Sequence, residues 1–566
     1  MNTIKSITNS FYLFCLLLVS AGCNNTENFL NESPTGFADP NTLLKDKKGA
    51  EIFTIGTYDA TRVLASDMNG WLSMWGTLAA DEICTPNWGA LSKPVYLHTL
   101  SPSNATVRSI WENLYISVNK ANSAIDRISA MTEDQIDLES RNQLVGESRF
   151  VRAMLYFALV SSWENIPLVK NETTNLEDIQ VAQSTPKEVY NFIVNDLLFA
   201  ESVLSASQGG GRATKGAAQA LLSKVYLQMT GFPLYESDKY GLAETKLKEV
   251  IDGNTYEILD FYPSVFALDN EQNKEMIFAI GFDGPGINQG GSLGTFYGPN
   301  GNVINGGQSG NNWFVNWELA GTSAPLPIGS GSWGARNNYT FAQGYHEDDI
   351  RSRNNVAKHN VNQGPWTSED GMYNEAARKS SLTGRRATWK PWKWHNIRPS
   401  NWGNDTPYDQ PYIRYSDVLL MYAEALNGQG KLTQTDVDMT VNKLRMRATK
   451  WPSEVKDQEV APLMILASME ENATEILSER RKELCFEGWR RNDLIRFGKY
   501  TEAINVTQPS WSNSGNPATQ FSDFEDQFQL FIFIALIFLF LDIFLFDSKT
   551  SWIKKLNLFN DNNAAN

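Results

Sequence analysis

Residues 476–500, ILSERRKELCFEGWRRNDLIRFGKY, interleave acidic and basic side chains at a spacing that predicts a helix. Glutamates recur at every fourth position: Glu475, Glu479, Glu483 and Glu487. Basic side chains lie between them: Arg480, Arg481 and Lys482. Opposite charges three or four residues apart are neighbours on a helix surface and stabilise it. Ile476, Leu477 and Leu484 fall close together on the helical wheel and predict a buried apolar strip. Gly488 then ends the helix.

An arginine-rich stretch can also bind phosphate or nucleic acid. Here the carboxylates nearly balance the basic side chains, so the stretch has little net positive charge. The whole chain has 64 acidic and 49 basic residues and a net charge of −15. Phosphate binding needs a basic face. We therefore expect a structural charge network in this stretch and no nucleic-acid partner.

The composition predicts a folded protein with a substantial core. The chain has 566 residues, of which 42% are hydrophobic and 20% charged, which argues against wholesale disorder. Its 17 tryptophans, 20 tyrosines and 29 phenylalanines supply the core and also suit stacking on sugar rings. Four cysteines do not make a disulfide framework. Cys84 and Cys485 are expected to be buried thiols.

The N-terminus has the pattern of an export signal. Lys5 gives it a positive start, and residues 11–19 form an apolar run too short to span a membrane and remain there. Ser20-Ala21-Gly22 then precede Cys23, which resembles a lipoprotein box in which Cys23 becomes the acylated first residue. Ser20 replaces the usual leucine of that motif. The alternative is an ordinary cleaved signal without lipid.

Apolar residues at helical spacing dominate the next two hundred residues. They predict helices at 51–64, 111–128, 143–163, 184–204, 211–229 and 242–251. Asn122 lies on an apolar helix face and is expected to be a buried hydrogen-bonding residue. Thr185-Pro186 provides a capping residue followed by proline in the first turn. Helix pairs with short links predict a mostly α, tetratricopeptide-like scaffold of helix hairpins, although no strict repeat period is present.

Aromatic side chains gather in two loop-rich regions. Residues 71–98 mix them with glycine, proline and asparagine, and a large aromatic side chain is costly to expose without a use. Residues 253–410 begin with a strand at 274–282 and continue as an irregular excursion rich in glycine and asparagine. Burial in a core is the commoner fate of a tryptophan. With that alternative open, the candidate ligand-binding residues are Trp71, Trp75, Trp88, Tyr297, Trp313, Trp317 and Trp333.

Two further clusters admit a functional and a structural interpretation. The acidic run at 346–349 could hold a metal, but Arg351 follows it and favours an ion-paired turn. A basic aromatic cluster at 389–402 could stack a ligand, but packing next to a strand is favoured. We expect neither a metal nor a cofactor.

Five segments in order resemble the SusD/RagB family. They are W-x-x-LY with AN (111–122), SRFVRAMLYF with IPL (148–168), GRATKGAA with LLSKVYL (211–227), PYIRYSDVLLMYAEALN (411–427) and ERRKEL-x-x-EGWRRNDLIRFGKY (479–500). The Asp349-x-Arg351 turn resembles the family as well. Members of this family are cell-surface nutrient-binding lipoproteins of Bacteroidetes-type bacteria. The shared motifs belong to the scaffold and not to the ligand site, so the resemblance assigns no binding residue.

The resemblance implies a non-catalytic lipoprotein at the outer-membrane surface. Such a protein captures an oligosaccharide as the lid of a SusC-like TonB-dependent transporter. Aromatic faces that cover sugar rings, with polar groups at the rim, fit this role. The chain shows no motif of nucleophilic or phosphate chemistry. Two alternatives remain: an exported glycoside hydrolase with two carboxylates in a cleft, and a helical-repeat scaffold that binds protein or peptide.

The C-terminus departs from the family pattern. Residues 530–546, LFIFIALIFLFLDIFLF, have the length and apolarity of a membrane span. A frameshifted or aberrant terminus is our interpretation, ahead of a true span or a buried helix. The expected segments are a lipoprotein signal peptide (1–22), a lipid-anchored tether and N-terminal segment (23–40), a first helical part (41–252), an irregular excursion (253–410), a second helical part (411–527) and an aberrant apolar tail (528–566).

Overall fold

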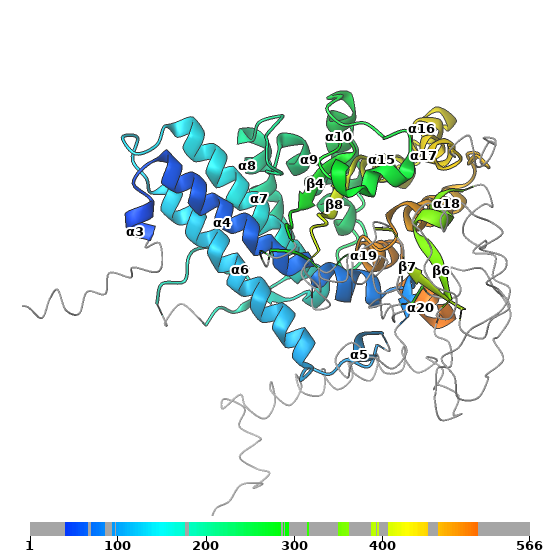
Figure 1. Cartoon of the computed structure of the whole chain (residues 1–566), viewed down its shortest axis with the longest axis horizontal. Coiled ribbons are helices and arrows are strands. Elements are labelled where there is room, and N and C mark those ends of the chain that lie inside the picture. Colours follow the sequence, from blue (N-terminus) through cyan, green and yellow to red (C-terminus); the bar gives the residue numbers. More distant parts are fainter. Residues whose placement is uncertain are drawn as a thin grey trace, which may run out of the picture.

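The structure, a computed structural model, is mostly helical (Figure 1). It describes residues 40–65, 70–84, 93–96, 98–175, 180–284, 287, 289–291, 293, 314–315, 349–360, 387–391, 393–394, 406–450 and 462–507. Cys23, the signal segment and the 528–566 tail lie outside these ranges, so the predictions for them stay predictions. Within them, no helix is both long and apolar enough to cross a membrane.

The first helical part is a run of helices that pack on their sequence neighbours. After the short α3 (Pro40–Leu43) come α4 (Lys47–Ala65), α6 (Ala105–Ser129), α7 (Leu138–Trp163), α8 (Pro186–Val203), α9 (Lys215–Met229) and α10 (Lys239–Asp252). From α6 to α10 each helix contacts the next, and α4 lies against both α6 and α7. This succession confirms the predicted helix-hairpin scaffold. The predicted helices all occur, with ends that differ by a few residues.

The second helical part returns to the first through α15. Helix α15 (Tyr415–Gly428) packs on α10 and on α18 (Met469–Leu484). Between them lie α16 (Gln434–Met439) and α17 (Val441–Ala448), and after them come α19 (Arg490–Arg496) and α20 (Tyr500–Thr507). The buried side chains of Ile476, Leu477 and Leu484 confirm the apolar strip expected on α18. Cys485, which follows α18, carries a buried thiol that forms no disulfide, as expected.

The described strands are short and pair antiparallel. The ladders are β1 (Ile83–Cys84) with β5 (Phe314–Val315), β2 (Ile166–Pro167) with β3 (Gln183–Ser184), β4 (Met276–Ile280) with β8 (Gln410–Arg414), and β6 (Val356–Asn360) with β7 (Ala387–Pro391). Strand β4 confirms the strand predicted at 274–282. Its pairing of Met276 with Arg414 and Ile280 with Gln410 places the start of the excursion beside the start of α15. The remaining short elements are α5 (Lys93–Tyr96), η3 (Tyr262–Phe266), η4 (Leu268–Asn270) and α12 (Arg351–Asn354).

Residues 72–78 differ from the loop expected for this region. They form η1 (Leu72–Leu78), a π-helix whose side chains are all buried. Its Gly76 lies so close to Gly488 that an added Cβ would be 1.9 Å from the Gly488 carbonyl oxygen. Gly488 has a φ of 90°, which glycine adopts readily and other residues do not. Both glycines are therefore needed for η1 to pack against the turn between α18 and α19.

Asn122 confirms the buried polar role expected from its helix face. The residue has no exposed surface. Its Nδ2 donates to the carbonyl oxygens of Val169 (3.0 Å) and Asn171 (2.9 Å), and its Oδ1 accepts from Nη1 of Arg152 (2.8 Å). Asn122 therefore fixes the segment after α7 against α6.

Replacing Asn122 by alanine is expected to lower the free energy of unfolding by about 2–3 kcal/mol. The change leaves two buried carbonyl groups and one guanidinium donor without their partner, and each such loss is costly. Chemical denaturation measures the effect. Asn113→Ala, on the exposed side of the same helix, is the matched control and should change the free energy by less than about 0.5 kcal/mol. Equal effects of the two changes would contradict the assignment.

Candidate ligand-binding site and its scaffold

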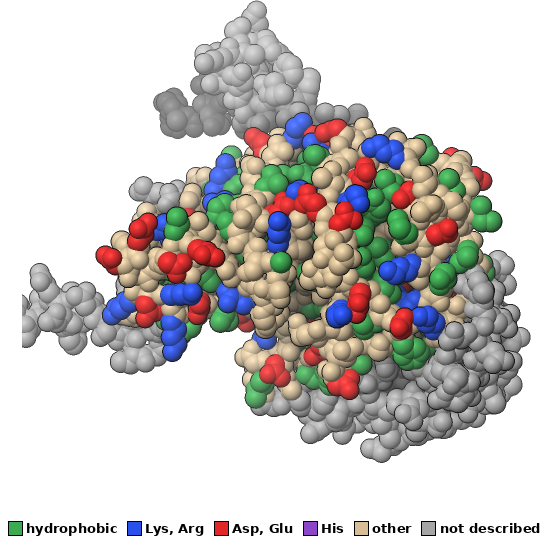
Figure 2. Space-filling model, turned by 90° about the horizontal axis from the view of Figure 1, so that it is seen from above, with side chains coloured by type: hydrophobic (Ala, Val, Ile, Leu, Met, Phe, Trp, Pro, Cys, Tyr) green, Lys and Arg blue, Asp and Glu red, His purple; other side chains and the backbone are tan. Residues whose placement is uncertain are grey.

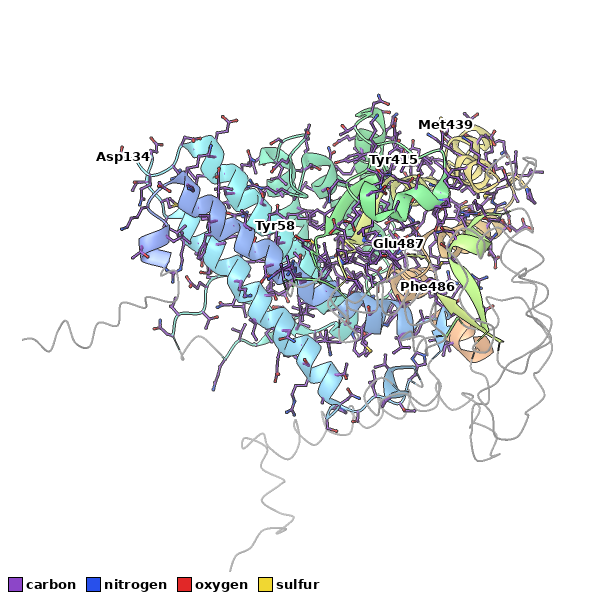
Figure 3. All side chains as sticks on the ribbon, in the orientation of Figure 1. Tyr58, Asp134, Tyr415, Met439, Phe486 and Glu487 are labelled. Carbon is purple, nitrogen blue, oxygen red and sulfur yellow. The ribbon has the colours of Figure 1, made fainter. Side chains whose placement is uncertain are left out.

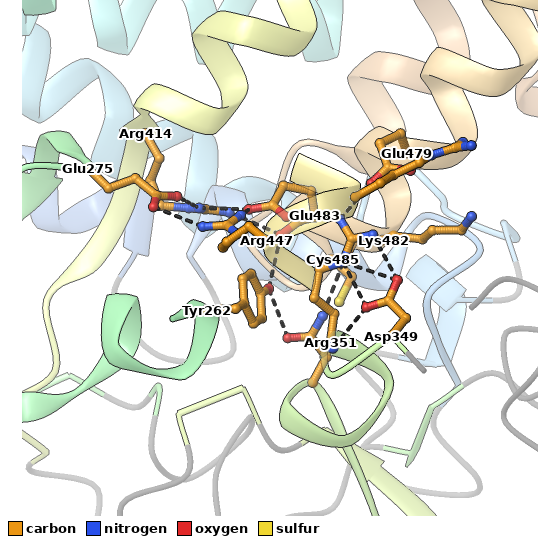
Figure 4. Close-up of polar contacts among 12 residues, drawn as sticks. Tyr262, Glu275, Asp349, Arg351, Arg414, Arg447, Glu479, Lys482, Glu483 and Cys485 are labelled. Atoms are coloured by element: carbon orange, nitrogen blue, oxygen red, sulfur yellow. Dashed lines mark hydrogen bonds and ion pairs between the residues drawn. The ribbon is translucent and has the colours of Figure 1, made fainter. Parts of the chain in front are cut away.

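The carboxylates of α18 are the centre of a buried charge network (Figure 4). Glu483 has no exposed surface and accepts from Arg447 (2.6 Å), Arg351 (3.0 Å) and Arg414 (3.1 Å). We call the connected set the Glu483 network; its members are Glu275, Asp349, Arg351, Lys393, Arg414, Arg445, Arg447, Glu479, Glu483 and Glu487. These residues come from six separate segments of the chain, so the network ties those segments to α18.

The partners of the α18 carboxylates differ from the expected ones. The sequence spacing predicted pairs within the helix, whereas Glu479 pairs with Arg351 (2.6 Å) and Arg445 (2.8 Å), which lie on other elements. The prediction of a structural charge network is confirmed. Lys482, three residues along the helix, also acts electrostatically on Glu479, but the ion pairs given for Glu479 join it to other elements, because long side chains that face a core reach the charges packed against it.

Arg480 of α18 forms a second buried network. It donates to Asp493 (2.9 Å) and Asp417 (2.9 Å). Arg496 joins Asp493 (2.9 Å) to Glu424 (2.6 Å). Helix α18 is thus bound to α15 and α19 by charge as well as by apolar contact.

Two carboxylates of these networks, Glu483 and Asp493, are held ionised. Burial alone would raise the pKa of Glu483, but the charges of Arg447, Arg414 and Arg351 lower it far below its ordinary value. Burial would likewise raise the pKa of Asp493, and Arg480 with Arg496 lowers it to about 2. Each of these groups therefore stabilises the fold above its unfolded pKa and loses that effect as the pH falls through the folded value.

Two ambiguous clusters of the sequence are structural where the structure describes them. Asp349 accepts from the backbone amide (2.9 Å) and from Nη2 (2.8 Å) of Arg351, which confirms the Asp-x-Arg turn. Trp394 is buried, and Lys393 donates to the carbonyl oxygens of Glu483 (2.9 Å) and Cys485 (3.0 Å). These two residues pack beneath α18, and packing was the favoured interpretation.

Trp71 is a core residue, so its prediction as a ligand-binding residue is wrong. Its side chain has no exposed surface. The indole nitrogen donates to Oγ of Ser162 (2.7 Å), and the ring packs edge-on against Trp489 at 5.8 Å. A ring enclosed on both faces cannot stack on a sugar.

Trp75 is also buried, with 6% of its surface exposed, and does not offer the ring face predicted for it. The ring lies 5.9 Å from that of Trp163. Its indole nitrogen, however, is buried without a hydrogen-bond partner. The other predicted ligand-binding residues lie outside the described residues and stay predictions: Trp88, Tyr297, Trp313, Trp317 and Trp333.

A partly exposed aromatic cluster continues outward from Trp75. Trp163, the last residue of α7, lies 5.2 Å from Trp111 at an interplanar angle of 80°, and Trp111 lies 4.9 Å from Tyr115. All three rings are only partly buried. We call these residues, with Trp75, the α7-end cluster. It involves the N-terminal end of α6, which lies near α5 in Figure 1.

Polar groups without partners border the α7-end cluster. Glu164 is partly buried, and in the described part of the chain its carboxylate makes no hydrogen bond or ion pair. Burial raises the pKa of Glu164, and the charge of Arg491 partly offsets this. Nη1 of Arg491 donates to the carbonyl oxygen of Ser161 (3.2 Å). This arrangement places a carboxylate beside partly exposed rings, and binding sites commonly combine apolar surface with a few polar groups.

The sequence predicts Trp111 on a helix face and Trp163 at a helix end. It does not predict that the two rings meet. The spacing of Trp111 and Tyr115, four residues apart on one helix, was the available signal. Nothing in the sequence indicated that Trp163 lies against Trp111.

The face shown in Figure 2 mixes both signs of charge. On the face in Figure 2, acidic and basic side chains alternate, and the basic ones do not gather into one patch. Phosphate backbones need such a patch.

Comparisons with known proteins identify the family. The model of the SusD family matches residues 274–529, and a model described as starch-binding and associating with the outer membrane matches residues 53–227. The chain belongs to the SusD/RagB family. The SusD-like protein P25 of Formosa agariphila is 25% identical over 533 residues, covering 85% of this chain and 89% of P25. The starch-binding protein SusD of Bacteroides thetaiotaomicron is 25% identical, covering 71% of this chain and 72% of SusD.

Solved structures of the SusD/RagB family share the fold. A SusD-like carbohydrate-binding protein from Bacteroides fragilis superposes with a TM-score of 0.64 at 22% identity and covers 82% of this chain and 88% of its own. A laminarin-binding SusD-like protein gives a TM-score of 0.60 at 20% identity and covers 84% of this chain and 95% of its own. The family match therefore agrees with the observed scaffold. The charged residues of the segment 479–500 form the buried networks around α18.

Replacing Arg414 by methionine is expected to cost about 3–5 kcal/mol of unfolding free energy. The change removes one buried counter-charge from each of Glu275, Glu483 and Glu487, and breaking a buried ion pair on one side is strongly destabilising. Equilibrium denaturation measures it. Arg108→Met, at an exposed position, is the control with an expected effect near zero. A loss below about 1 kcal/mol for Arg414→Met would show that the network is not what holds α18.

Glu82 should make the stability of the fold depend on pH in the opposite direction to Glu483 and Asp493. Its Oε2 accepts from the backbone amide of Phe486 (3.1 Å), and its Oε1 has no partner among the described residues. Burial raises its pKa from 4.5 to about 8. Between these two values the unfolded chain ionises Glu82 and the folded protein does not, so this group lowers stability as the pH rises.

Glu82→Gln should therefore stabilise the protein by about 2–4 kcal/mol at pH 8 and leave its stability nearly unchanged at pH 4.5. Thermal or chemical unfolding across this range measures the difference. Glu133→Gln is the control: its neighbour Asp134 lies at the far end of the α6–α7 hairpin, away from Phe486 (Figure 3). A stability difference for Glu82→Gln that does not vary with pH would refute the prediction.

Proposed function

We propose that this protein is a non-catalytic glycan-binding lipoprotein that captures an oligosaccharide for import. The observation that carries the proposal is membership of the SusD/RagB family, matched in both helical parts of the chain. Among its relatives are a protein named as starch-binding and one named as laminarin-binding. The aromatic supply of the chain and the α7-end cluster are the physical features that suit sugar rings.

The proposed location is the cell surface at the outer membrane. The matched family description names an association with the outer membrane. Acylation of Cys23 would supply the anchor, and a SusC-like TonB-dependent transporter would be the partner that receives the glycan. Trp88, Tyr297, Trp313, Trp317 and Trp333 remain the proposed ligand-binding residues of the excursion and the segment before α5.

The carboxylates of the two networks around α18 do not supply the general acid of a glycoside hydrolase. A glycoside hydrolase needs a general acid with a raised pKa beside a second carboxylate. In the two networks around α18, Glu483, Asp493, Glu479 and Asp417 have lowered pKa values. Glu271, whose pKa burial raises to about 8, uses its Oε1 to accept from the backbone amide of Asp409 (2.7 Å). These groups hold the fold, and we assign none of them a catalytic role.

Native affinity gels test the proposal. The full chain, purified in detergent, is run through soluble starch, laminarin and xyloglucan. We expect retardation by one of these glycans, without release of reducing sugar. Trp313→Ala and Trp333→Ala should weaken the retardation while the protein stays folded.

Trp71→Ala is the contrasting variant, because it removes a core ring and should cost about 3–5 kcal/mol of stability. Folded wild-type protein that no glycan retards would overturn glycan capture in favour of a protein or peptide ligand. Release of sugar would establish the hydrolase alternative.

A further inference from the structure

We propose that the C-terminal end of α7 is a second sugar-binding subsite, in which Trp111 and Trp163 contact the apolar face of a neutral hexopyranose and Glu164 accepts hydrogen bonds from its hydroxyl groups. The inference rests on the proposed glycan-binding function and adds a place on the molecule and residues that carry the contact. Its residues are other than those predicted in the excursion.

Two aromatic rings set nearly at right angles form the apolar side of the subsite, and we call this pair the aromatic corner. Trp111 and Trp163 stand nearly at right angles, with centroids 5.2 Å apart, and Tyr115 extends the apolar surface from Trp111. The hydroxyl of Tyr115 donates to the carbonyl oxygen of Pro167 (2.7 Å), so the ring is fixed. Trp163 is held from below by Trp75. Rigid, partly exposed rings present apolar surface without an ordering cost on binding.

The backbone at Glu164 is strained in a way that its side chain does not explain. Its φ of 58° and ψ of −86° lie in a region that residues other than glycine rarely adopt. A glycine would adopt this conformation with little strain. The chain nevertheless has a glutamate there, at the edge of the aromatic corner. Such conformations concentrate at ligand sites, where the strained residue serves the ligand.

The side chain of Glu164 contributes nothing visible to the fold. Within the described ranges its carboxylate has no hydrogen-bond or ion-pair partner, although the residue is partly buried. The buried indole N–H of Trp75 also has no partner. Nearly all buried polar groups in folded proteins are hydrogen-bonded. Hydroxyl groups of a sugar can donate hydrogen bonds to the carboxylate of Glu164.

The charges around the corner favour a neutral sugar. Glu164 and Arg491 lie within electrostatic reach of each other and of Tyr190, whose pKa burial and Glu164 raise and Arg491 lowers. His98, near Arg491, is uncharged at neutral pH because burial and that guanidinium lower its pKa to about 4. One negative and one positive charge therefore balance. A uronate or sulfated sugar would meet the Glu164 carboxylate at close range, which disfavours it.

Three substitutions separate binding from folding. Glu164→Gln keeps the shape and removes the charged acceptor. Glu164→Gly removes the side chain and relieves the backbone strain. Trp111→Ala removes one wall of the corner. The matched controls are Glu133→Gln for the carboxylate and Tyr235→Ala for the ring, since Tyr235 is 68% exposed elsewhere on the molecule.

Each full-length variant is compared with the wild type in native affinity gels containing soluble starch, laminarin or xyloglucan, and by thermal unfolding. We expect at least fivefold weaker retention for Glu164→Gln and Glu164→Gly and at least tenfold weaker retention for Trp111→Ala. Glu164→Gly should unfold at a higher temperature than the wild type while it binds more weakly. The controls should bind like the wild type.

The inference is overturned if the wild type is retained and the folded Glu164 and Trp111 variants are retained equally. Higher stability of Glu164→Gly with unchanged retention would also overturn it, because Glu164 would then be a strained residue without a ligand. Stronger retention of the wild type on polygalacturonate than on the neutral glycans would contradict the neutral-sugar assignment. If none of the glycans retains the wild type, the proposed function is refuted, and this inference with it.

Discussion

The pairing of Glu483 with three guanidinium groups is the interaction on which the rest of the structure depends. Arg351, Arg414 and Arg447 come from α12, β8 and α17, and all converge on one carboxylate of α18. Each charge has lost its water, so none of these side chains can leave alone without a large cost. The network therefore specifies one arrangement of these elements, because few other packings would satisfy so many buried charges together.

The same region joins the C-terminal helices to the N-terminal ones. Gly76 and Gly488 allow η1 to lie against the turn after α18. Trp489 then packs against Trp71, Phe157 and Tyr412, and its indole nitrogen donates to the carbonyl oxygen of Tyr412 (3.0 Å). The end of α7 is thus fixed by contacts with residues more than three hundred positions away. A rigid end of this kind is a suitable place for a binding surface.

Much of the scaffold could be predicted from the sequence. Helical periodicity and the Thr185-Pro186 cap located the first helical part, and the row of glutamates located α18, because these signals are local. The partners of those glutamates could not be predicted, since Arg351 and Arg414 are brought to them by the fold. Trp71 is predicted to bind ligand because its sequence neighbours are typical of a loop. The prediction fails because Gly76 and Gly488 approach closely and the segment packs into the core.

The α7-end cluster was missed for a related reason. Trp111 and Trp163 look like ordinary residues of two separate helices, and no sequence pattern shows that their rings meet. The backbone angle of Glu164 is likewise invisible in the sequence, because a glutamate at a helix end carries no sign of a left-handed conformation. Sequence reasoning therefore locates the elements and leaves the contacts between their ends undetermined.

Hydrogen exchange of the full chain, with and without the glycan that retains it, tests the central claim most directly. The central claim is that buried ion pairs hold the scaffold rigid and that this scaffold presents a fixed aromatic surface to a sugar. It predicts that amides of α18 and β8 exchange most slowly and do not respond to the glycan, while protection increases at the start of α6 and around residues 163–165. Fast exchange in α18, or glycan-dependent protection confined to the interior of α15 and α18, would contradict it.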